Sequence, residues 1–533
     1  MVRLTEIRLP LDHPPEALRA AVLERLGVTD AQLCRIEVFR RAVDARRKAA
    51  IKLTYTIDVE LAPGVSPAAH RHTRVTPDMA YRVPKVVQPP ARPVVIGTGP
   101  CGLFAALVLA QAGLRPIILE RGKRVRERTA DTWGLWRRGV LNPESNAQFG
   151  EGGAGTFSDG KLYSQISDPR HLGRKVLSEF VAAGAPEEIL TVAHPHIGTF
   201  RLVGMVETMR TTIEKLGGEY RFGARVTDLV IEPAAGQRRL RGVVLADGTM
   251  IATDHVVLAI GHSARDSFAM LRARGVHLDA KPFAVGVRIE HPQSMIDRAR
   301  FGHFAGHKLL GAADYKLVHH ASNGRAVYSF CMCPGGTVVA ATSEPGHVVT
   351  NGMSQYSRNE RNANAGMVVN IDPADYGGLE DVLAGVAFQR ALEARAFVAG
   401  GENYRAPGQL LGDFLAQRAS SAFGEIIPSY RPGVTLTDLA PCLPDFVVTA
   451  MREALPAFGR MIPGFDRADA VLTGVETRTS APIRITRGAD GQSLNTIGLF
   501  PAGEGAGYAG GILSAGVDGI KAAEAVAQSL RVR

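Results

Sequence analysis

The fold is decided by the stretch V-V-I-G-T-G-P-C-G at residues 94–102. An apolar strand precedes the glycines, an apolar helix follows them, and a second strand ends at Glu120. In a Rossmann-type turn, Gly97 permits the tight bend, Gly99 lets the main chain approach a diphosphate, and Gly102 lets helix and strand pack closely. The stretch therefore predicts a dinucleotide-binding domain with a parallel sheet.

The residues beside this turn complete the expected phosphate and ribose contacts. The helix begins at Pro100 and Cys101, and its N-terminus presents unpaired N–H groups and partial positive charge to a phosphate. Glu120 follows Gly102 by 18 residues, at a place where a carboxylate accepts hydrogen bonds from ribose hydroxyls. Arg121 comes next and joins the predicted cofactor-binding residues.

The turn alone does not choose between NAD and FAD, and three further segments favour FAD. The first is G-E-G-G-A-G-T-F-S-D-G-K-L at 150–162, which predicts main chain pressed against a flat ligand with a cation nearby. The second is R-F-G-A-R-V at 221–226, which leads into three short strands, and the third is a strand, glycine turn and helix at 498–516. In the first segment we expect cofactor contacts at Gly152, Gly153, Thr156 and Lys161.

These segments resemble the FAD superfamily typified by glutathione reductase. In that superfamily the last strand ends in Gly-Asp, whose acid holds the ribityl chain; this chain has Gly503-Glu504, with a side chain one methylene longer. The resemblance implies that the next helix points its N-terminus at the flavin, where a helix dipole stabilises the anionic reduced ring. It also implies contacts at Val226, for the adenine, and at Gly261, Gly510, Gly511 and Ile512.

The whole chain resembles, more closely, a bacterial family of FAD-dependent dehydrogenases. The resemblance rests on F-R-R-A-V-D-A-R-R-K (39–48), on the 150–162 loop, on G-H-S-A-R-D (261–266) and on Y-S-F-C-M-C-P-G-G (328–336). It implies FAD as the cofactor and an architecture, and it leaves the substrate open.

The element pattern predicts an α/β fold class with three parts. We expect a Rossmann-type FAD-binding domain of parallel sheet and three-stranded β-meander, an inserted α+β substrate domain, and a small N-terminal α+β module of ferredoxin-like βαββ order. Helices are expected at about 379–397 and 408–419 within the insertion. The expected boundaries are 1–88 for the N-terminal module, 92–281 and 461–533 for the FAD-binding domain, and 282–460 for the insertion.

Composition and charge indicate a globular protein from a reducing compartment. The net charge is +10, and the first 92 residues hold 16 Lys and Arg against 10 Asp and Glu. This excess fits either an acidic partner such as nucleic acid or a solvated basic face. The chain has five cysteines, no C-x-x-C, no apolar signal core and no run of 18 apolar residues. We therefore expect a cytoplasmic protein without membrane contact.

Three side chains are predicted to be catalytic, each with an alternative reading. His262 follows the strand end at Gly261, where it could exchange a proton with a substrate or pack beside the phosphates. Arg288 shares one face of a strand with Glu290, so it either anchors a substrate carboxylate or pairs with that glutamate. Tyr508 lies in the last glycine turn and either gates the flavin or packs there.

Other candidates have weaker signals. Arg265 could bind an anion or form a salt bridge, for example to Asp266. Cys331 and Cys333 share one strand face, and they are either redox-active, which needs an exposed thiol of low pKa, or buried and inert. With Cys442 they lack a fourth ligand, so no metal is expected.

The function predicted from these features is hydride transfer between flavin N5 and an unidentified organic substrate, with NAD(P)H or another electron donor or acceptor as a further partner. The substrate would bind between the FAD-binding domain and the 282–460 insertion. A first alternative is an RNA-modifying flavoprotein, which would grip RNA through the basic run within 40–48. A second is a non-catalytic FAD-binding redox sensor.

Overall fold

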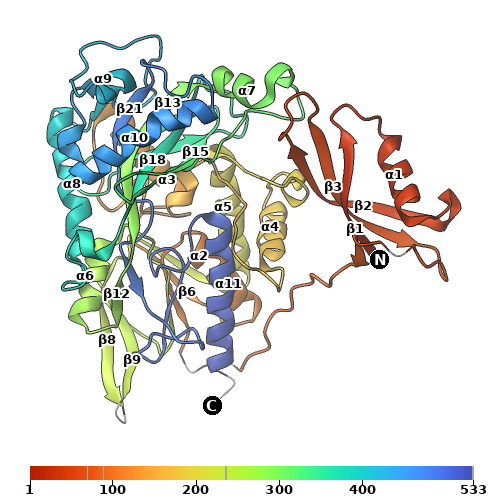
Figure 1. The fold of residues 1–533 in the computed structure, drawn as a ribbon. Helices are drawn as coiled ribbons and strands as arrows, with labels where there is room; N and C mark the ends of the chain where they lie inside the picture. The colour runs from red at the N-terminus through yellow and green to blue at the C-terminus, as the bar shows by residue number, and fades with distance from the viewer. Residues whose placement is uncertain (69, 88, 90, 235–236, 531–533) are drawn as a thin grey trace.

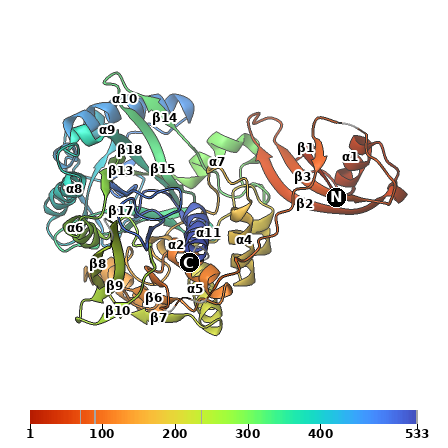
Figure 2. The same ribbon diagram turned by 90° about the horizontal axis from the view of Figure 1, so that it is seen from below.

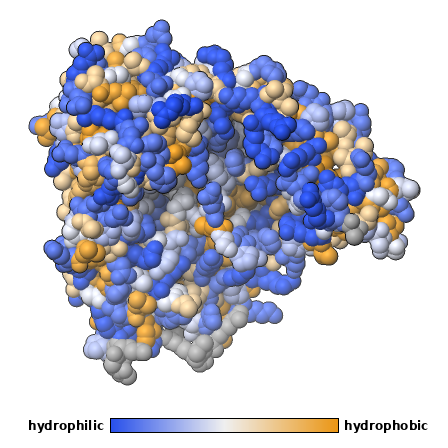
Figure 3. Space-filling view, viewed as in Figure 1, coloured by the Kyte–Doolittle hydropathy of each residue, from blue (hydrophilic) through white to orange (hydrophobic). Residues whose placement is uncertain are grey.

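The computed structural model describes residues 1–68, 70–87, 89, 91–234 and 237–530. The chain forms a large body around two main sheets, and a small N-terminal sheet projects from that body (Figure 1). No helix among the described residues is long and apolar enough to cross a membrane. On the face drawn in Figure 3, hydrophilic residues predominate and hydrophobic ones form small separate groups. Scattered hydrophobic residues of this kind are normal on a protein surface.

A parallel sheet organises the first part of the body, which we call the parallel-sheet unit. Its strands pair in the order β23-β11-β5-β6-β7, and every pairing is parallel. Val95 and Ile118 pack against the helices on one face, whereas Val94 and Ile117 pack against the meander on the other, because side chains alternate along a strand. The strands are β5 (Val94–Ile96), β6 (Ile117–Glu120), β7 (Glu219–Phe222), β11 (Val256–Leu258) and β23 (Leu499–Pro501).

Helices and a three-stranded meander cover the two faces of this sheet. The meander pairs in the order β10-β9-β8, and the pair β12–β22 joins distant parts of the chain. The covering helices are α2 (Pro100–Gln111), α3 (Val125–Arg138), α4 (Leu172–Ala182), α5 (Thr199–Lys215), α6 (Arg265–Ala273) and α11 (Ile512–Ser529), and the strands are β8 (Val226–Ala234), β9 (Gln237–Leu245), β10 (Met250–Ala252), β12 (Leu278–Ala280) and β22 (Ile483–Ile485).

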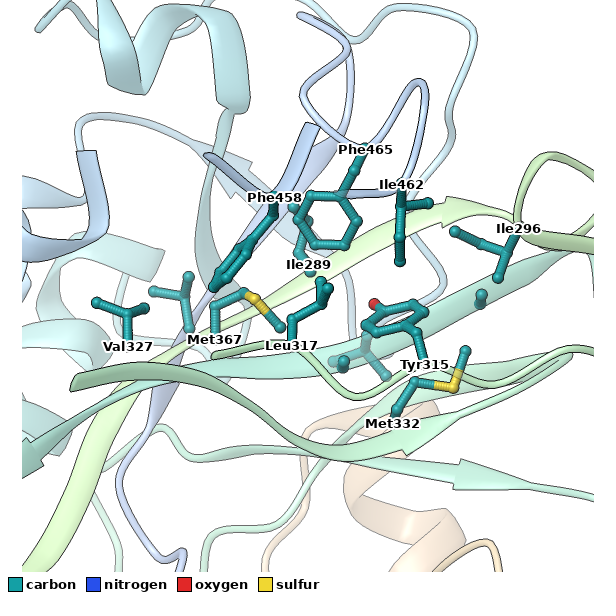
Figure 4. Close-up of a cluster of buried hydrophobic side chains, with 14 of the residues drawn as sticks. Ile289, Ile296, Tyr315, Leu317, Val327, Met332, Met367, Phe458, Ile462 and Phe465 are labelled. Atoms are coloured by element: carbon teal, nitrogen blue, oxygen red, sulfur yellow. The ribbon is translucent and has the colours of Figure 1, made fainter. Parts of the chain in front are cut away.

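A mixed sheet of seven strands organises the second part of the body, which we call the second unit. Its order is β14-β15-β18-β13-β21-β19-β20, and the hairpin β16–β17 lies beside it. Phe458 and Phe465 pack edge to face over Ile289 and Met367 in its core (Figure 4). Its elements are β13 (Phe283–Pro292), α7 (Gln293–Phe301), β14 (Val318–His320), β15 (Ala326–Cys333), β16 (Gly336–Ala340), β17 (Thr350–Ser354), β18 (Asn362–Ile371), α8 (Ala384–Gly400), β19 (Ala406–Leu410), α9 (Leu411–Leu415), β20 (Val434–Leu436), α10 (Asp445–Met461) and β21 (Val471–Glu476).

Two expectations for this unit differ from the structure. The helix expected at 408–419 is instead the end of β19 followed by the single turn of α9. β19 pairs with β20 and β21, so tertiary pairing overrides the local helical pattern. The sheet also takes β21 from residues beyond 460, and the second unit therefore extends past the end expected from the sequence.

The N-terminal module is a four-stranded antiparallel sheet with one helix. It comprises β1 (Val2–Pro10), α1 (Glu16–Leu26), β2 (Leu33–Asp44), β3 (Lys52–Leu61) and β4 (Thr73–Val75), with strand order β2-β3-β1-β4. Figure 2 shows it standing beside α4 and α7. Arg41 on β2 joins it to the body, where its N–H donates to Thr191 O at 2.6 Å and its carbonyl accepts from Ala193 N at 2.9 Å.

Candidate functional site

A cavity of about 390 Å³ lies where the parallel-sheet unit meets the second unit. On one side it is lined by the carboxyl ends of β5, β6, β11 and β23 and the loops that follow them, which is where ligands bind in open parallel sheets. On the other side the second unit contributes Phe330, Cys331, Asn351 and Glu476, and the adjoining Arg478 and Thr479 complete the wall. The lining contains sixteen predicted site residues: Gly97, Gly99, Pro100, Cys101, Glu120, Arg121, Gly153, Lys161, Val226, Gly261, His262, Gly503, Glu504, Gly510, Gly511 and Ile512.

The glycines leave a cradle of bare main chain at one end of this cavity. Gly97 has a φ of +98°, and a Cβ there would collide with the carbonyl of Ala259. Gly153 has a φ of +62°, and its Cβ would lie 2.6 Å from the Cα of Gly99. Only glycine lets the main chain of these loops approach so closely, and the residues present fit a dinucleotide diphosphate at the N-terminus of α2.

Three predicted cofactor residues act behind the cradle rather than in its lining. A Cβ on Gly102 would collide with the carbonyl of Gly97, so a glycine here lets the first turn of the helix pack closely against the preceding loop. A Cβ on Gly152 would collide with the hydroxyl of Thr156, a buried side chain. Gly102, Gly152 and Thr156 therefore shape the loops and do not face the cavity.

Glu120 binds main chain on both sides of the cradle. Its carboxylate accepts from Thr98 N at 3.1 Å, Thr98 Oγ1 at 2.6 Å, Gly122 N at 2.9 Å and Gly150 N at 3.0 Å. The structure thus gives Glu120 a loop-tying role in addition to the ribose contact expected of it.

Arg128 was not predicted, although it organises the 146–153 loop. Its guanidinium is fully buried and donates to the carbonyls of Asn146, Ala147 and Glu151 at 2.8–2.9 Å, and also to Gly153 O at 2.8 Å. Burial lowers its pKa to about 10, so the group stays charged at neutral pH. The signal was an arginine on the buried face of an amphipathic helix, between the buried residues of α3.

Glu504 is a partly buried carboxyl group in the cavity wall. Burial raises its pKa from the ordinary value of 4.5 to about 7, while the charge of Lys281 acts in the opposite direction. Lys281 is itself held by a hydrogen bond to Ser480 Oγ at 3.1 Å. Glu504 can therefore give up or accept a proton close to neutral pH, as a general acid or base requires.

We expect Glu504 to make stability depend on pH. Between pH 4.5 and about 7 the unfolded chain ionises this group while the folded protein keeps it protonated, so stability falls as pH rises. The shift corresponds to about 3 kcal/mol lost across that window. The free energy of unfolding can be measured with urea at several pH values for the FAD-free wild type and for Glu504→Gln. Between pH 4.5 and about 7 it should fall by that amount in the wild type relative to the variant. Parallel pH curves for the two proteins would contradict the assignment.

His262 lines the cavity as a neutral imidazole. Burial, together with the charges of Arg478 and Arg265, lowers its pKa to about 3. Its Nδ1 lies 2.9 Å from Ser263 Oγ. His262 is therefore neutral near pH 7 and cannot donate a proton as an imidazolium. This removes one form of the proton exchange that was expected of it.

Arg265 forms a salt bridge, as one of its two alternatives expected, and its partners are acids other than Asp266. Arg265 does not pair with Asp266 but donates to Glu393 at 2.6 Å and to Glu344 at 2.7 Å. Arg478 binds the same Glu393 carboxylate at 2.9 Å, and all three side chains are buried. Although burial favours the neutral acid, the two arginines hold the pKa of Glu393 well below its ordinary value. This cluster ties α6 to α8 across the cavity wall.

Arg288 is not a free anchor for a substrate carboxylate. It is fully buried, it does not line the cavity, and its Nε donates to Glu476 at 2.7 Å. Its other nitrogens donate to Cys331 O at 2.9 Å and to Asn351 Oδ1 at 3.0 Å. Arg288 is thus a positioning residue that holds three wall residues, and Glu290 binds elsewhere, to Ser429 N at 3.0 Å.

Tyr508 does not gate the cavity either. Its hydroxyl accepts from the main-chain N–H of Arg487 at 3.0 Å, and its ring packs 3.9 Å from that residue's guanidinium carbon. It is absent from the cavity lining. Main-chain hydrogen bonds within the glycine turn hold the segment that carries Tyr508. The position of Tyr508 in the sequence does not reveal which way its side chain points.

Lys161 is the cation expected beside the glycine loop. It lines the cavity, donates to the carbonyl of Met332 and lies 3.9 Å from Asp159. Asp159 is buried and also pairs with Arg358, whose Nε lies 3.0 Å away. Lys161 thus brings a positive charge from the parallel-sheet unit next to the end of β15 that lines the cavity.

Known proteins give two kinds of match. An uncharacterized protein of Clostridium beijerinckii is 44% identical over 532 residues, covering 98% of each chain. Residues 282–479 match a family described as "FAD-dependent protein, C-terminal domain-like", and residues 1–60 match a domain of unknown function.

Among solved structures, halogenase PltM is 11% identical to this chain, with a TM-score of 0.39. The matched region covers 83% of this chain and 69% of the halogenase. A flavocytochrome c3 fumarate reductase is 13% identical, with coverages of 83% and 78% and a TM-score of 0.36.

Proposed function

Because this chain belongs to the same family as the Clostridium beijerinckii protein, and its residues 282–479 match a family of FAD-dependent proteins, we propose that it is an FAD-dependent oxidoreductase. Its organic substrate would bind between the two units. One observation carries the proposal. A single cavity is lined both by the glycine cradle and by second-unit side chains, and it contains a carboxyl group with a pKa near neutrality. Such a combination is typical of an active site.

The cofactor is FAD, and the cavity offers groups for each of its parts. Gly97, Gly99 and Gly153 would hold the diphosphate against the N-terminus of α2. Gly510 and Gly511 precede α11, and a Cβ on either would meet no atom within 4 Å, so the main chain there is open to a ring system. When bound, FAD supplies hydride transfer.

The chain's own residues would supply position, charge and a proton. Glu504 Oε would hold the proton that a substrate gains or loses, because its pKa matches the working pH. Arg288 keeps Glu476 and Asn351 turned toward the substrate space. Phe330 and the buried wall behind it would exclude water from the reacting atoms.

An anaerobic reduction experiment tests the proposal. The purified yellow protein is mixed with panels of small organic acids, alcohols, amines and unsaturated compounds, and separately with NADPH and NADH, while flavin absorbance is followed. We expect at least one organic compound to bleach the flavin or to reoxidise the reduced protein rapidly. Slow bleaching with every donor and acceptor would instead favour the non-catalytic redox sensor.

The role of Glu504 gives a second prediction for the same reaction. Glu504→Gln cannot exchange a proton, so the rate of flavin reduction at pH 7 should fall by about 10²–10⁴-fold, and its pH dependence near pH 7 should flatten. Glu504→Asp is the matched control, since it keeps a carboxyl group and should retain both the pH dependence and part of the rate. Equal losses in the two variants, with equal FAD content, would show that the carboxyl group carries no proton.

A further inference from the structure

Two cysteines at the second-unit wall have an unusual main-chain setting. β15 loses its regular register with β18 between Phe330 and Cys333, and Cys331 within this irregularity has a φ of +43°. A residue other than glycine rarely adopts this conformation, which persists only where its surroundings support it. Bulges of this kind often turn a side chain toward an active site. Here the irregularity places Cys331 in the cavity lining.

The second thiol lies against the main chain of the first cysteine. Cys333 is buried, and its Sγ lies 3.3 Å from the carbonyl oxygen of Cys331. In an extended strand, residues two apart are separated by about 6.7 Å, which is at the long end of the Cα separations of about 4.4–6.8 Å that disulfides span. The regular pairing of β15 with β18 is lost between Phe330 and Cys333, so the two cysteines do not stand in a regularly paired strand.

The charges around the pair favour a reactive first thiol. A side-chain hydrogen bond with the Cys333 thiol lowers the pKa of Cys331 well below its ordinary value, and Lys161 and Arg288 act in the same direction against burial. The pKa of Cys333 is correspondingly raised, first by that hydrogen bond and then by burial. Cys331 thus has the character of an attacking thiol, and Cys333 that of a resolving thiol.

We propose that Cys331 and Cys333 form a thiol–disulfide exchange pair that reacts with low-molecular-mass disulfides entering the cavity. The Cys331 sulfur, as thiolate, attacks one sulfur of the small disulfide, forms a mixed disulfide and releases one thiolate, which takes up a proton. The Cys333 thiol then gives its proton to solvent and attacks the Cys331 sulfur, and the second small thiol leaves with a proton. The pair is oxidised by two electrons, and the small disulfide becomes two thiols.

This inference goes beyond hydride transfer to an organic substrate, and its test reads cysteine mass rather than turnover. The FAD-bound full-length protein is used with Cys34→Ser, because Cys34 is exposed and would react independently. The reduced protein is treated with oxidised glutathione, quenched in acid, alkylated and digested with trypsin. Both cysteines fall within the peptide 326–358, which contains no other cysteine.

We expect this peptide to lose the mass of two hydrogens and to regain it with dithiothreitol. With Cys333→Ser added, one glutathione should accumulate on Cys331, whereas Cys331→Ser should leave Cys333 unmodified. In the unsubstituted pair under native conditions, Cys331 should alkylate roughly 10-fold or more faster than Cys442, an internal control whose thiol pKa is raised by burial. An unmodified 326–358 peptide, or equal alkylation of Cys331 and Cys442, would overturn the proposal.

Discussion

Replacing Gly99 by valine is expected to give a folded protein that no longer retains FAD. Gly99 has φ −65° and ψ 178°, which valine adopts without strain. A Cβ there would meet only the Cα of Gly153, at 3.7 Å, so the fold tolerates it. Because Gly99 lines the cavity, the methyl groups would stand where the diphosphate binds. FAD affinity should fall by at least roughly 100-fold, or about 2.7 kcal/mol.

Two measurements separate loss of binding from loss of folding. Fluorescence titration of the FAD-free protein gives the affinity, and urea unfolding of the same preparation should change by less than about 1 kcal/mol. Gly204→Val is the matched control, because Gly204 lies exposed on α5 with no atom within 4 Å of its Cβ position and should retain FAD. A Gly99→Val protein that purifies with its full complement of FAD would place the diphosphate elsewhere.

Replacing Arg128 by methionine is expected to cause the largest loss of stability. The guanidinium satisfies buried carbonyls of the 146–153 loop, and methionine offers no donor to replace it. Each buried carbonyl left without a partner costs about 1–3 kcal/mol, so the free energy of unfolding should fall by about 3–5 kcal/mol. FAD retention should fall as well, because Gly153 of the cradle belongs to the same loop.

Arg126→Met on the same helix is the control for this experiment. Arg126 is 74% exposed and pairs with Glu207 at the surface, so its loss should cost under about 1 kcal/mol in urea unfolding. If the two variants were destabilised equally, the loss at Arg128 would reflect a general effect on α3 rather than the buried hydrogen bonds.

The parts of the site that sequence could predict are those encoded over short stretches. The turn at 94–102, the 150–162 loop and Gly503-Glu504 each signal main chain near a ligand, and residues from all three line one cavity. Contacts between side chains far apart in the sequence gave no such signal. Arg288 and Glu476 are 188 residues apart, so the neighbouring Glu290 looked like the natural partner. The irregularity at Cys331 likewise depends on how β15 meets β18, which alternation along one strand cannot reveal.

The strand order of the parallel sheet has a consequence for the biosynthesis of this protein. β23 begins at Leu499 and pairs directly with β11, which ends at Leu258, so the whole second unit is translated between two neighbouring strands. Domains tend to fold as they emerge from the ribosome, but here the edge strand and α11 emerge only after the whole second unit. A nascent chain therefore lacks the part of the cavity lined by residues 503–512 until the second unit has been made, and a chain cut before Leu499 should yield colourless protein however well the earlier segments fold.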